Sequence, residues 1–403
     1  MTTNGPLTGV RVLELGNFIA GPFAGQLLGD YGADVIKIES PGDGDPMRRW
    51  GVTCEGDSLW WPTIARNKRS VVIDLRDERG QQLAAQLAGK CDVVLENFRP
   101  GVLERWGLDY QTLSAQNRRL VMVHVSGFGQ TGPLAGQAGF GSVGEAMGGI
   151  RYTTGSPDRP PSRAGISLGD ALASVFAVVG TLSALLAARE KGTGQEVDVA
   201  IYEAVAALME STMADYELGG VVRTRSGSVL PGVAPSNVYP TADGADVVIA
   251  ANADGVFARL CKAMDQSELA SDPRFATHHG RGANMAELDE VIAAWTSQYP
   301  CEELLAILDE HVVPAGRIFT APDMLRDQQY LAREMVRRVT SAQGWEVPMT
   351  GVVPRFTETP GTIRHAGPRL GQHTDEVLTE LLGIEAAEVT GLRDAGVIAT
   401  EAP

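Results

Sequence analysis

The stretch GVRVLELGNFIAGPFAGQLLGDYGADVIKIES, residues 9–40, predicts a strand, a helix and a second strand. Residues 10–16 and 34–40 are dense in β-branched side chains, and segment 20–33 between them has the composition and length of a short helix. Apolar strands joined by short helices are typical of a parallel sheet that is covered on both faces. The opening of the chain therefore predicts a βαβ unit.

The same alternation continues along the first half of the chain. Further strands are predicted at 70–75, 92–98 and 119–128, and a helix at 79–91. Residues 194–216 supply one more strand and helix. This pattern indicates an α/β fold with an open, doubly wound, Rossmann-like parallel sheet.

A stretch rich in Gly, Pro and Ser, residues 219–240, predicts a domain boundary. A hairpin with an Asp-Gly turn and three amphipathic helices follow it, at 241–252, 255–264, 285–299 and 301–311. A chain of 403 residues is long enough for two domains. We expect a large domain that begins with 1–220, a linker and smaller α/β domain at 221–335, and a C-terminal segment at 336–403.

Composition is typical of an ordinary soluble globular protein and argues against partners of high negative charge. The net charge is −16, so the mean electrostatic field repels nucleic acids and acidic membrane surfaces. The first residues lack an apolar signal core, and the uncharged stretch 171–186 falls just short of the length that spans a bilayer. We therefore expect 171–186 to be a buried helix, with no nucleic-acid or membrane partner.

The four cysteines are far apart and form no CxxC pair, and only two of the six histidines, His278 and His279, are close neighbours. This pattern is typical of reduced thiols in a cytoplasmic protein and argues against a disulfide framework or a metal site.

Asp170 is the most informative single residue, because it lies where a polar, Gly-containing stretch gives way to the long apolar helix. The dipole and the unpaired N–H groups of a helix start favour a carboxylate in its ionised form, as a nucleophile requires. Asp is also a preferred N-cap, so position alone leaves a purely structural role open.

Dinucleotide motifs do not explain the sheet. Residues 139–144 match G-x-G-x-x-G, but they follow a loop rather than the first strand, so we interpret the match as accidental. Basic residues at the predicted ends of strands and helices are candidates for holding an anionic ligand, or are simply solvated charges. They are Lys68, Arg69, Arg76, Arg99 and Arg105.

Several long motifs together resemble the family III CoA-transferases. They are residues 9–45, NKRSVVIDL (67–75), VLENFRPGVLERWGL (94–108), SGFGQTGP (126–133), Gly169–Asp170 and GQHTDEVL (371–378). The resemblance covers the chain from about residue 7 to the last helix. It implies transfer of CoA between an acyl-CoA and a free carboxylic acid, with CoA as a substrate and no permanently bound cofactor.

In that family the aspartate that matches Asp170 is the nucleophile. It attacks the donor thioester to give a mixed anhydride, and CoA then moves through an aspartyl-CoA thioester to the acceptor acid. Covalent catalysis of this kind divides one difficult exchange into easier steps. The resemblance thus makes Asp170 the expected catalytic residue.

The resemblance also implies CoA contacts. By motif these are Asn97, Phe98, Arg105 and Arg76, the last an arginine where the formyl-CoA enzymes carry a lysine. Phe18, Ala20 and Phe140 are expected to line the pantetheine or acyl region. Phe18 and Phe98 are equally consistent with plain core residues.

Two departures narrow the expected reaction. Racemases of this superfamily carry a His-Asp pair where this chain has Phe140 and Gly141, so the acid–base pair for racemisation is missing. Formyl-CoA enzymes carry a glutamine where this chain has Ile19, which counts against oxalate or formyl specificity. The pattern is closer to transferases of succinyl-type dicarboxylic esters. The residues that would bind the second carboxylate of such a substrate can be proposed by charge alone. The candidates are Arg48, Arg49, Arg163 and Arg225.

We therefore expect a CoA-transferase. A 2-methylacyl-CoA racemase or isomerase of the same superfamily, or a CoA-binding protein without activity, remains the alternative. The resemblance further implies a homodimer of two interlocked, ring-like chains, in which the C-terminal segment returns to the large domain.

Overall fold

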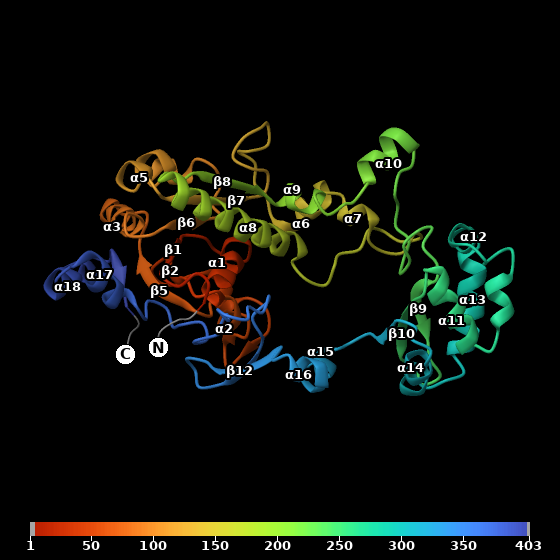
Figure 1. Cartoon of the computed structure of the whole chain (residues 1–403). Helices are drawn as coiled ribbons and strands as arrows, with labels where there is room; N and C mark the ends of the chain where they lie inside the picture. Colours follow the sequence, from red (N-terminus) through yellow and green to blue (C-terminus); the bar gives the residue numbers. More distant parts are fainter. Residues whose placement is uncertain (1–4, 401–403) are drawn as a thin grey trace. The chain divides into compact units, whose positions relative to one another are not determined.

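The computed structural model describes residues 5–400 and divides them into two compact units (Figure 1). One unit comprises the chain up to Ile150, Ala164–Ser211 and the chain from Gln328; the other comprises Arg151–Arg163 and Thr212–Asp327. The assignment of 1–220, 221–335 and 336–403 to a CoA-binding domain, a small domain and a returning segment remains a prediction, because packing alone does not identify what a unit binds.

A seven-stranded sheet with the order β14-β5-β2-β1-β6-β7-β8 forms the centre of the first unit. All neighbouring strands from β5 to β8 are parallel, and the short β14 joins the edge antiparallel to β5. The bounds are β1 Arg11–Glu14, β2 Asp34–Glu39, β5 Lys68–Ile73, β6 Val93–Glu96, β7 Val121–Ser126, β8 Glu196–Ala200 and β14 Ile398–Ala399. The predicted α/β fold with an open parallel sheet is confirmed.

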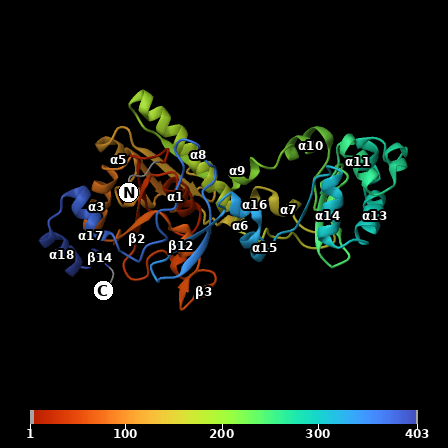
Figure 2. The same ribbon diagram turned by 60° about the horizontal axis from the view of Figure 1, so that its bottom comes forward.

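Helices cover both faces of this sheet because successive side chains of a strand point to opposite faces. Val12 and neighbouring residues pack beneath α1 (Ala20–Asp30) and α8 (Leu168–Lys191), which lie side by side over one face (Figures 1 and 2). Leu13 and its neighbours pack against the helices of the other face. These are α3 Glu78–Ala88, α5 Tyr110–Gln116, α17 Thr374–Leu382 and α18 Ala386–Asp394.

The apolar helix α8 is long and hydrophobic enough to cross a membrane by length and composition alone, with a mean hydropathy of 2.2. In this structure it packs along the sheet through small side chains, including Ala173 and Ala177, which are fully buried. Its outer side carries exposed apolar residues, among them Phe176 and Val179. The expected buried helix is thus buried on one side only.

The C-terminal segment belongs to the first unit, where α17, α18 and β14 complete one face and one edge of the sheet. The antiparallel strands β12 (Val336–Thr340) and β13 (Glu346–Thr350) precede them. The remaining elements outside the second unit's core are short. They are η1 Pro46–Arg49, β3 Thr53–Cys54, β4 Asp57–Ser58, α2 Trp61–Ile64, α4 Val102–Arg105, α6 Gly141–Met147, α7 Ile150–Thr153, α9 Ile201–Ala206 and α16 Gln328–Ala332.

The second unit has its own core, built on the antiparallel sheet β11-β10-β9. The predicted hairpin is present as β9 (Ser236–Pro240) and β10 (Asp246–Ala250), and β11 is Ala315–Arg317. The helices are α10 Thr212–Gly219, α11 Asp254–Ala263, η2 Ser267–Ser271, α12 His278–Ala283, α13 Met285–Thr296, α14 Cys301–Glu310 and α15 Ala321–Arg326. The three amphipathic helices expected here correspond to α11, α13 and α14.

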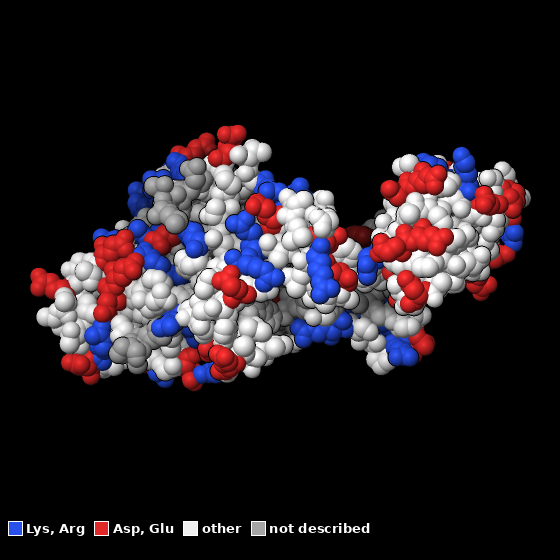
Figure 3. All heavy atoms as spheres, turned by 90° about the horizontal axis from the view of Figure 1, so that it is seen from below, with Lys and Arg blue, Asp and Glu red and all other residues white. Residues whose placement is uncertain are grey.

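Charged side chains of both signs are interspersed over the face of the molecule that Figure 3 shows. All four cysteines are free thiols, three of them buried. Among residues 5–400 there is no group of three or more His, Cys, Asp or Glu side chains placed to hold a metal ion.

Candidate functional site

A cavity of about 290 Å³ lies where the carboxyl ends of β1, β6 and β7 meet the start of α8. Ligands of open α/β sheets bind at this edge, because the loops that follow the strands converge there. Six of the predicted site residues come together among its lining: Phe18, Ala20, Asn97, Phe98, Phe140 and Asp170.

Asp170 is the third residue of α8 and is partly buried. Ser167, rather than Asp170, holds the N-cap position. A carboxylate in the first turn still benefits from the positive end of the helix dipole. Asp170 therefore presents a carboxylate to the cavity from a rigid helix.

Two glycines allow other backbone to approach this carboxylate closely. A Cβ atom on Gly141, the first residue of α6, would lie 2.2 Å from Oδ2 of Asp170. A Cβ atom on Gly169 would lie 3.0 Å from the carbonyl oxygen of Gly141, and the Gly169 N–H donates to the buried Glu145 at 3.1 Å. Gly141 and Gly144 of the G-x-G-x-x-G match thus allow close packing of α6, a role that the sequence interpretation of this motif did not consider.

Phe18 occupies the turn between β1 and α1 with a φ of 63°, in the left-handed region that a bulky residue rarely adopts. This conformation costs roughly 1 kcal/mol or more, so other contacts must hold it. The Phe18 ring meets Trp50 and Phe140 edge to face, at centroid distances of 5.4 Å and 6.1 Å. The three rings form an apolar wall of the cavity.

Asn97 supports the same turn. Its Oδ1 accepts the Asn17 N–H at 2.8 Å, and its Nδ2 donates to the Asn17 carbonyl at 2.8 Å. Phe98 packs edge to face on Trp106 at 5.3 Å and reaches both the core and the cavity. Both readings of Phe98, as core residue and as cavity residue, hold.

Of the basic residues predicted to hold an anionic ligand, Arg99 lines the cavity, whereas Arg76 and Arg105 lie outside its lining. Arg99 is the one basic side chain among the described residues that line the cavity. Arg76 and Arg105 do not line it: Arg76 is exposed and pairs with Asp74 through both ends of its guanidinium, and Arg105 is exposed at the end of α4. Contact of Arg76 and Arg105 with CoA remains a prediction.

Two other basic candidates are committed to protein contacts. Lys68 is fully buried, 2.8 Å from the Glu14 carboxylate, so it is neither a solvated charge nor a ligand contact. Arg48 binds both oxygens of Glu39, at 2.8 Å and 2.7 Å, which leaves it unsuited to read a substrate carboxylate.

The sequence interpretation missed several residues that line the cavity, although most lie inside motifs it quoted. They are Asn17, Trp50, Ser126, Phe128 and Gln137. Asn17 directly follows the predicted strand 10–16, and Ser126 and Phe128 lie at the carboxyl end of the predicted strand 119–128, which is a usable signal. Trp50 lies in an irregular loop after β2, and only tertiary packing brings it to Phe18.

A buried pair of ionisable groups lies directly behind the cavity. His124 Nδ1 is 2.6 Å from Oε1 of Glu96, and Oε2 of Glu96 accepts the Phe98 N–H at 2.6 Å. Burial by itself lowers the pKa of His124, but its hydrogen bond to Glu96 and the nearby carboxylate charges outweigh burial and raise that pKa. Burial raises the pKa of Glu96 as well.

Comparison with known proteins agrees with this architecture. The family model described as CoA-transferase family III matches residues 7–374. The chain is 56% identical, over 98% of both chains, to succinyl-CoA–D-citramalate CoA-transferase of Chloroflexus aurantiacus. It is 40% identical to the alpha subunit of succinyl-CoA–L-malate CoA-transferase of the same organism, over 98% of this chain and 92% of that one. A crystal structure of a CAIB/BAIF family protein from Brucella suis superposes with a TM-score of 0.83, at 37% identity, over 94% of this chain and all of that chain.

The His124–Glu96 pair predicts a pH-dependent contribution to stability. Both pKa values are raised, so the folded pair binds protons more tightly than the unfolded chain. The stabilising effect of the raised His124 pKa is therefore complete below the unfolded histidine value of about 6.5 and is lost as pH rises through the folded value. The effect of the raised Glu96 pKa is complete only below the lower unfolded value of a glutamate, about 4.3. We expect His124→Gln to lower the free energy of unfolding more at about pH 6 than at about pH 9, measured by urea denaturation. Equal losses at the two pH values would contradict this assignment.

Proposed function

The chain belongs to CoA-transferase family III, and we propose that it moves CoA from succinyl-CoA to a hydroxy-dicarboxylic acid through a covalent intermediate on Asp170. The names of its relatives support a dicarboxylate pair, because the names of both Chloroflexus enzymes pair succinyl-CoA with a C4 or C5 hydroxy-diacid. CoA is a substrate in this cycle, which needs no resident cofactor.

One observation carries the mechanism: the Asp170 carboxylate lines the cavity from the first turn of α8, with Gly141 leaving room beside it. A carboxylate oxygen of Asp170 attacks the thioester carbonyl carbon, the C–S bond breaks, and CoA leaves as a thiolate from a mixed anhydride. The thiolate then attacks the Asp170 carbonyl carbon, which gives an aspartyl-CoA thioester and releases succinate.

The second half of the cycle reverses these steps with the new acid. The acceptor carboxylate attacks the aspartyl thioester and releases CoA thiolate, leaving a second mixed anhydride. The thiolate attacks the acceptor's acyl carbon, which forms the new acyl-CoA and regenerates the Asp170 carboxylate. Each attack develops an oxyanion, and backbone N–H groups at the starts of α1 and α8 and in the glycine turns are suited to stabilise it.

The surroundings of Asp170 favour transfer over racemisation. The described residues that line the cavity include no histidine, and Phe140 and Gly141 stand where a racemase needs its acid–base pair. Phe18, Ala20, Phe98 and Phe140 supply an apolar wall for the pantetheine arm. We assign the CoA phosphates to Arg99, Arg76 and Arg105, which all follow the carboxyl ends of β5 and β6.

Replacing the nucleophile tests the covalent mechanism. We expect Asp170→Ala to fold and to bind CoA with an affinity within about threefold of the parent, while its kcat falls by about 10³ or more. Mass spectrometry of the parent enzyme incubated with succinyl-CoA should reveal an adduct on the peptide that contains Asp170. Near-normal turnover by the variant, or parent kinetics that require both substrates to be bound together, would overturn the mechanism.

The acceptor acid is tested separately. With succinyl-CoA as donor, we expect kcat/KM for D-citramalate or L-malate to exceed that for oxalate by about tenfold or more, because Ile19 offers the smaller diacid no polar side chain. Chromatographic separation of the acyl-CoA products from parallel reactions measures the ratio. A preference for oxalate or for a monocarboxylate would refute the proposed substrate class.

We further propose a cytoplasmic, interlocked homodimer whose active site lies between the large domain of one chain and the small domain of the other. The exposed apolar side of α8 supports an interface there, since Val175 is 47% and Val179 55% exposed while the opposite side of the helix packs on the sheet. Free thiols, three of them buried, support a reducing compartment.

Sedimentation velocity tests the dimer. The parent chain should sediment with twice the mass of one chain, and Val179→Glu should shift the population toward monomer, because it buries a charge in the proposed interface. A monomeric parent at micromolar concentration would exclude the dimer.

A further inference from the structure

We propose that Lys37 and Asp45 are positioning residues that hold the turn Gly16–Phe18, and with it the wall of the cavity to which Phe18 belongs. Neither residue lines the cavity, and both act through the backbone of the turn. The inference deepens the proposed function, because it assumes that CoA transfer takes place in the cavity that Asp170 lines.

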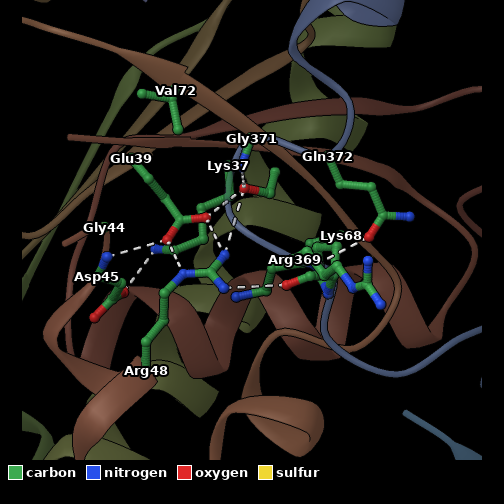
Figure 4. Close-up of polar contacts among 12 residues, drawn as sticks. Lys37, Glu39, Gly44, Asp45, Arg48, Lys68, Val72, Arg369, Gly371 and Gln372 are labelled. Carbon is green, nitrogen blue, oxygen red and sulfur yellow. Dashed lines mark hydrogen bonds and ion pairs between the residues drawn. The ribbon is translucent and has the colours of Figure 1, made fainter. Parts of the chain in front are cut away.

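The ammonium group of Lys37 is enclosed in protein and binds three oxygen atoms, of which Figure 4 shows the one from Asp45. Its Nζ lies 2.8 Å from Oδ2 of Asp45, 2.9 Å from Oε1 of Glu14 and 2.6 Å from the carbonyl oxygen of Gly16. The side chains of Lys37, Asp45 and Glu14 are at most 1% exposed, so no solvent competes for these contacts. One end of the turn is thus tied to a buried charge.

Asp45 ties the other end of the turn to the same charge. Its Oδ1 accepts the N–H of Phe18 at 3.1 Å and the N–H of Met47 at 2.9 Å, while Oδ2 faces Lys37. Phe18 has the left-handed backbone conformation, which a glycine would adopt without help. Here a phenylalanine adopts it, and the Asp45 carboxylate supplies the contact that holds it in place.

The loop that carries Asp45 is itself anchored by charge. The Asp45 N–H donates to Oε2 of Glu39 at 3.0 Å, and Glu39 binds Arg48 with both oxygens (Figure 4). Arg48 stacks on Trp61 at 3.8 Å and donates to the Pro368 carbonyl of the C-terminal segment at 3.2 Å. Asp45 therefore cannot shift without disturbing several buried contacts.

The chain contains a matched ion pair that lacks any link to the cavity. Arg66 and Asp30 are buried to a similar degree, 2% and 1% exposed, and are 2.6 Å apart at the far end of α1. Neither residue lines the cavity or contacts the turn. Asp30→Asn therefore makes the same chemical change as Asp45→Asn, but at a site where we expect it to affect the stability of the fold and not the cavity.

The test compares Asp45→Asn with Asp30→Asn in steady-state CoA transfer and in thermal unfolding. The amide keeps the shape of residue 45 but removes the charge that Lys37 requires, so the turn loses its fixed position.

A misplacement of about 1 Å at a reacting group lowers the rate about a hundredfold. We expect kcat of Asp45→Asn to fall about ten- to hundredfold, with KM for succinyl-CoA changed less than about threefold because most CoA contacts are remote. Asp30→Asn should lower the melting temperature while keeping kcat within about twofold.

The inference is overturned if Asp45→Asn keeps kcat within twofold of the parent, or if Asp30→Asn loses as much kcat as Asp45→Asn. Should Asp45→Asn not fold because Lys37 is left with too little negative charge, Lys37→Met/Asp45→Asn removes both charges and leaves Glu14 paired with Lys68. That double variant should be folded and slow, and parent-like kcat in it would also overturn the inference. An inactive Asp170→Ala beside a fully active Asp45→Asn rejects this inference alone, whereas an active Asp170→Ala rejects the proposed function.

Discussion

Lys37 and Lys68 share the buried carboxylate of Glu14 across three neighbouring strands, and the geometry of the first turn depends on this contact. Removing such charges from water costs several kcal/mol per ion, so each must find close partners. The partners here are backbone as well as side chains: Lys37 binds the Gly16 carbonyl and Lys68 the Pro22 carbonyl. These contacts link strands β2 and β5 to the turn before α1 and to α1 itself, and so help to fix how α1 leaves the sheet.

The cavity combines this rigid turn with a second rigid element, the start of α8. Small residues let α1 and α8 pack closely. The hydroxyl of Ser174 in α8 donates a hydrogen bond to the Ala20 carbonyl of α1 at 2.6 Å. On the other side, Gly141 and Gly169 let α6 approach the Asp170 carboxylate more closely than any side chain would permit. A carboxylate held in this way loses little freedom on meeting a substrate, and this preorganisation suits the role proposed for Asp170.

The C-terminal segment contributes to the same frame although it follows the second unit in the chain. Gly371 donates to the Ser70 hydroxyl, which in turn donates to Glu39, and Trp61 donates to the Pro368 carbonyl. The sheet edge, the Asp45 loop and this segment thus share one buried hydrogen-bonded network (Figure 4). An unfolded C-terminal segment would leave Ser70 and Glu39 with fewer partners, so folding of the site is coupled to its return.

The sequence by itself determined the α/β class, the parallel order of strand and helix, and the place of Asp170 at the start of α8. Periodicity and helix-start signals act over a few neighbouring residues, so they can be read in a short window. Only the tertiary structure decided that Trp50 meets Phe18, that Gly141 abuts Asp170, and that Lys68 is a buried partner of Glu14 rather than a ligand contact. These contacts join residues that are distant along the chain, and they depend on strand order and on the paths of loops, which local patterns do not specify.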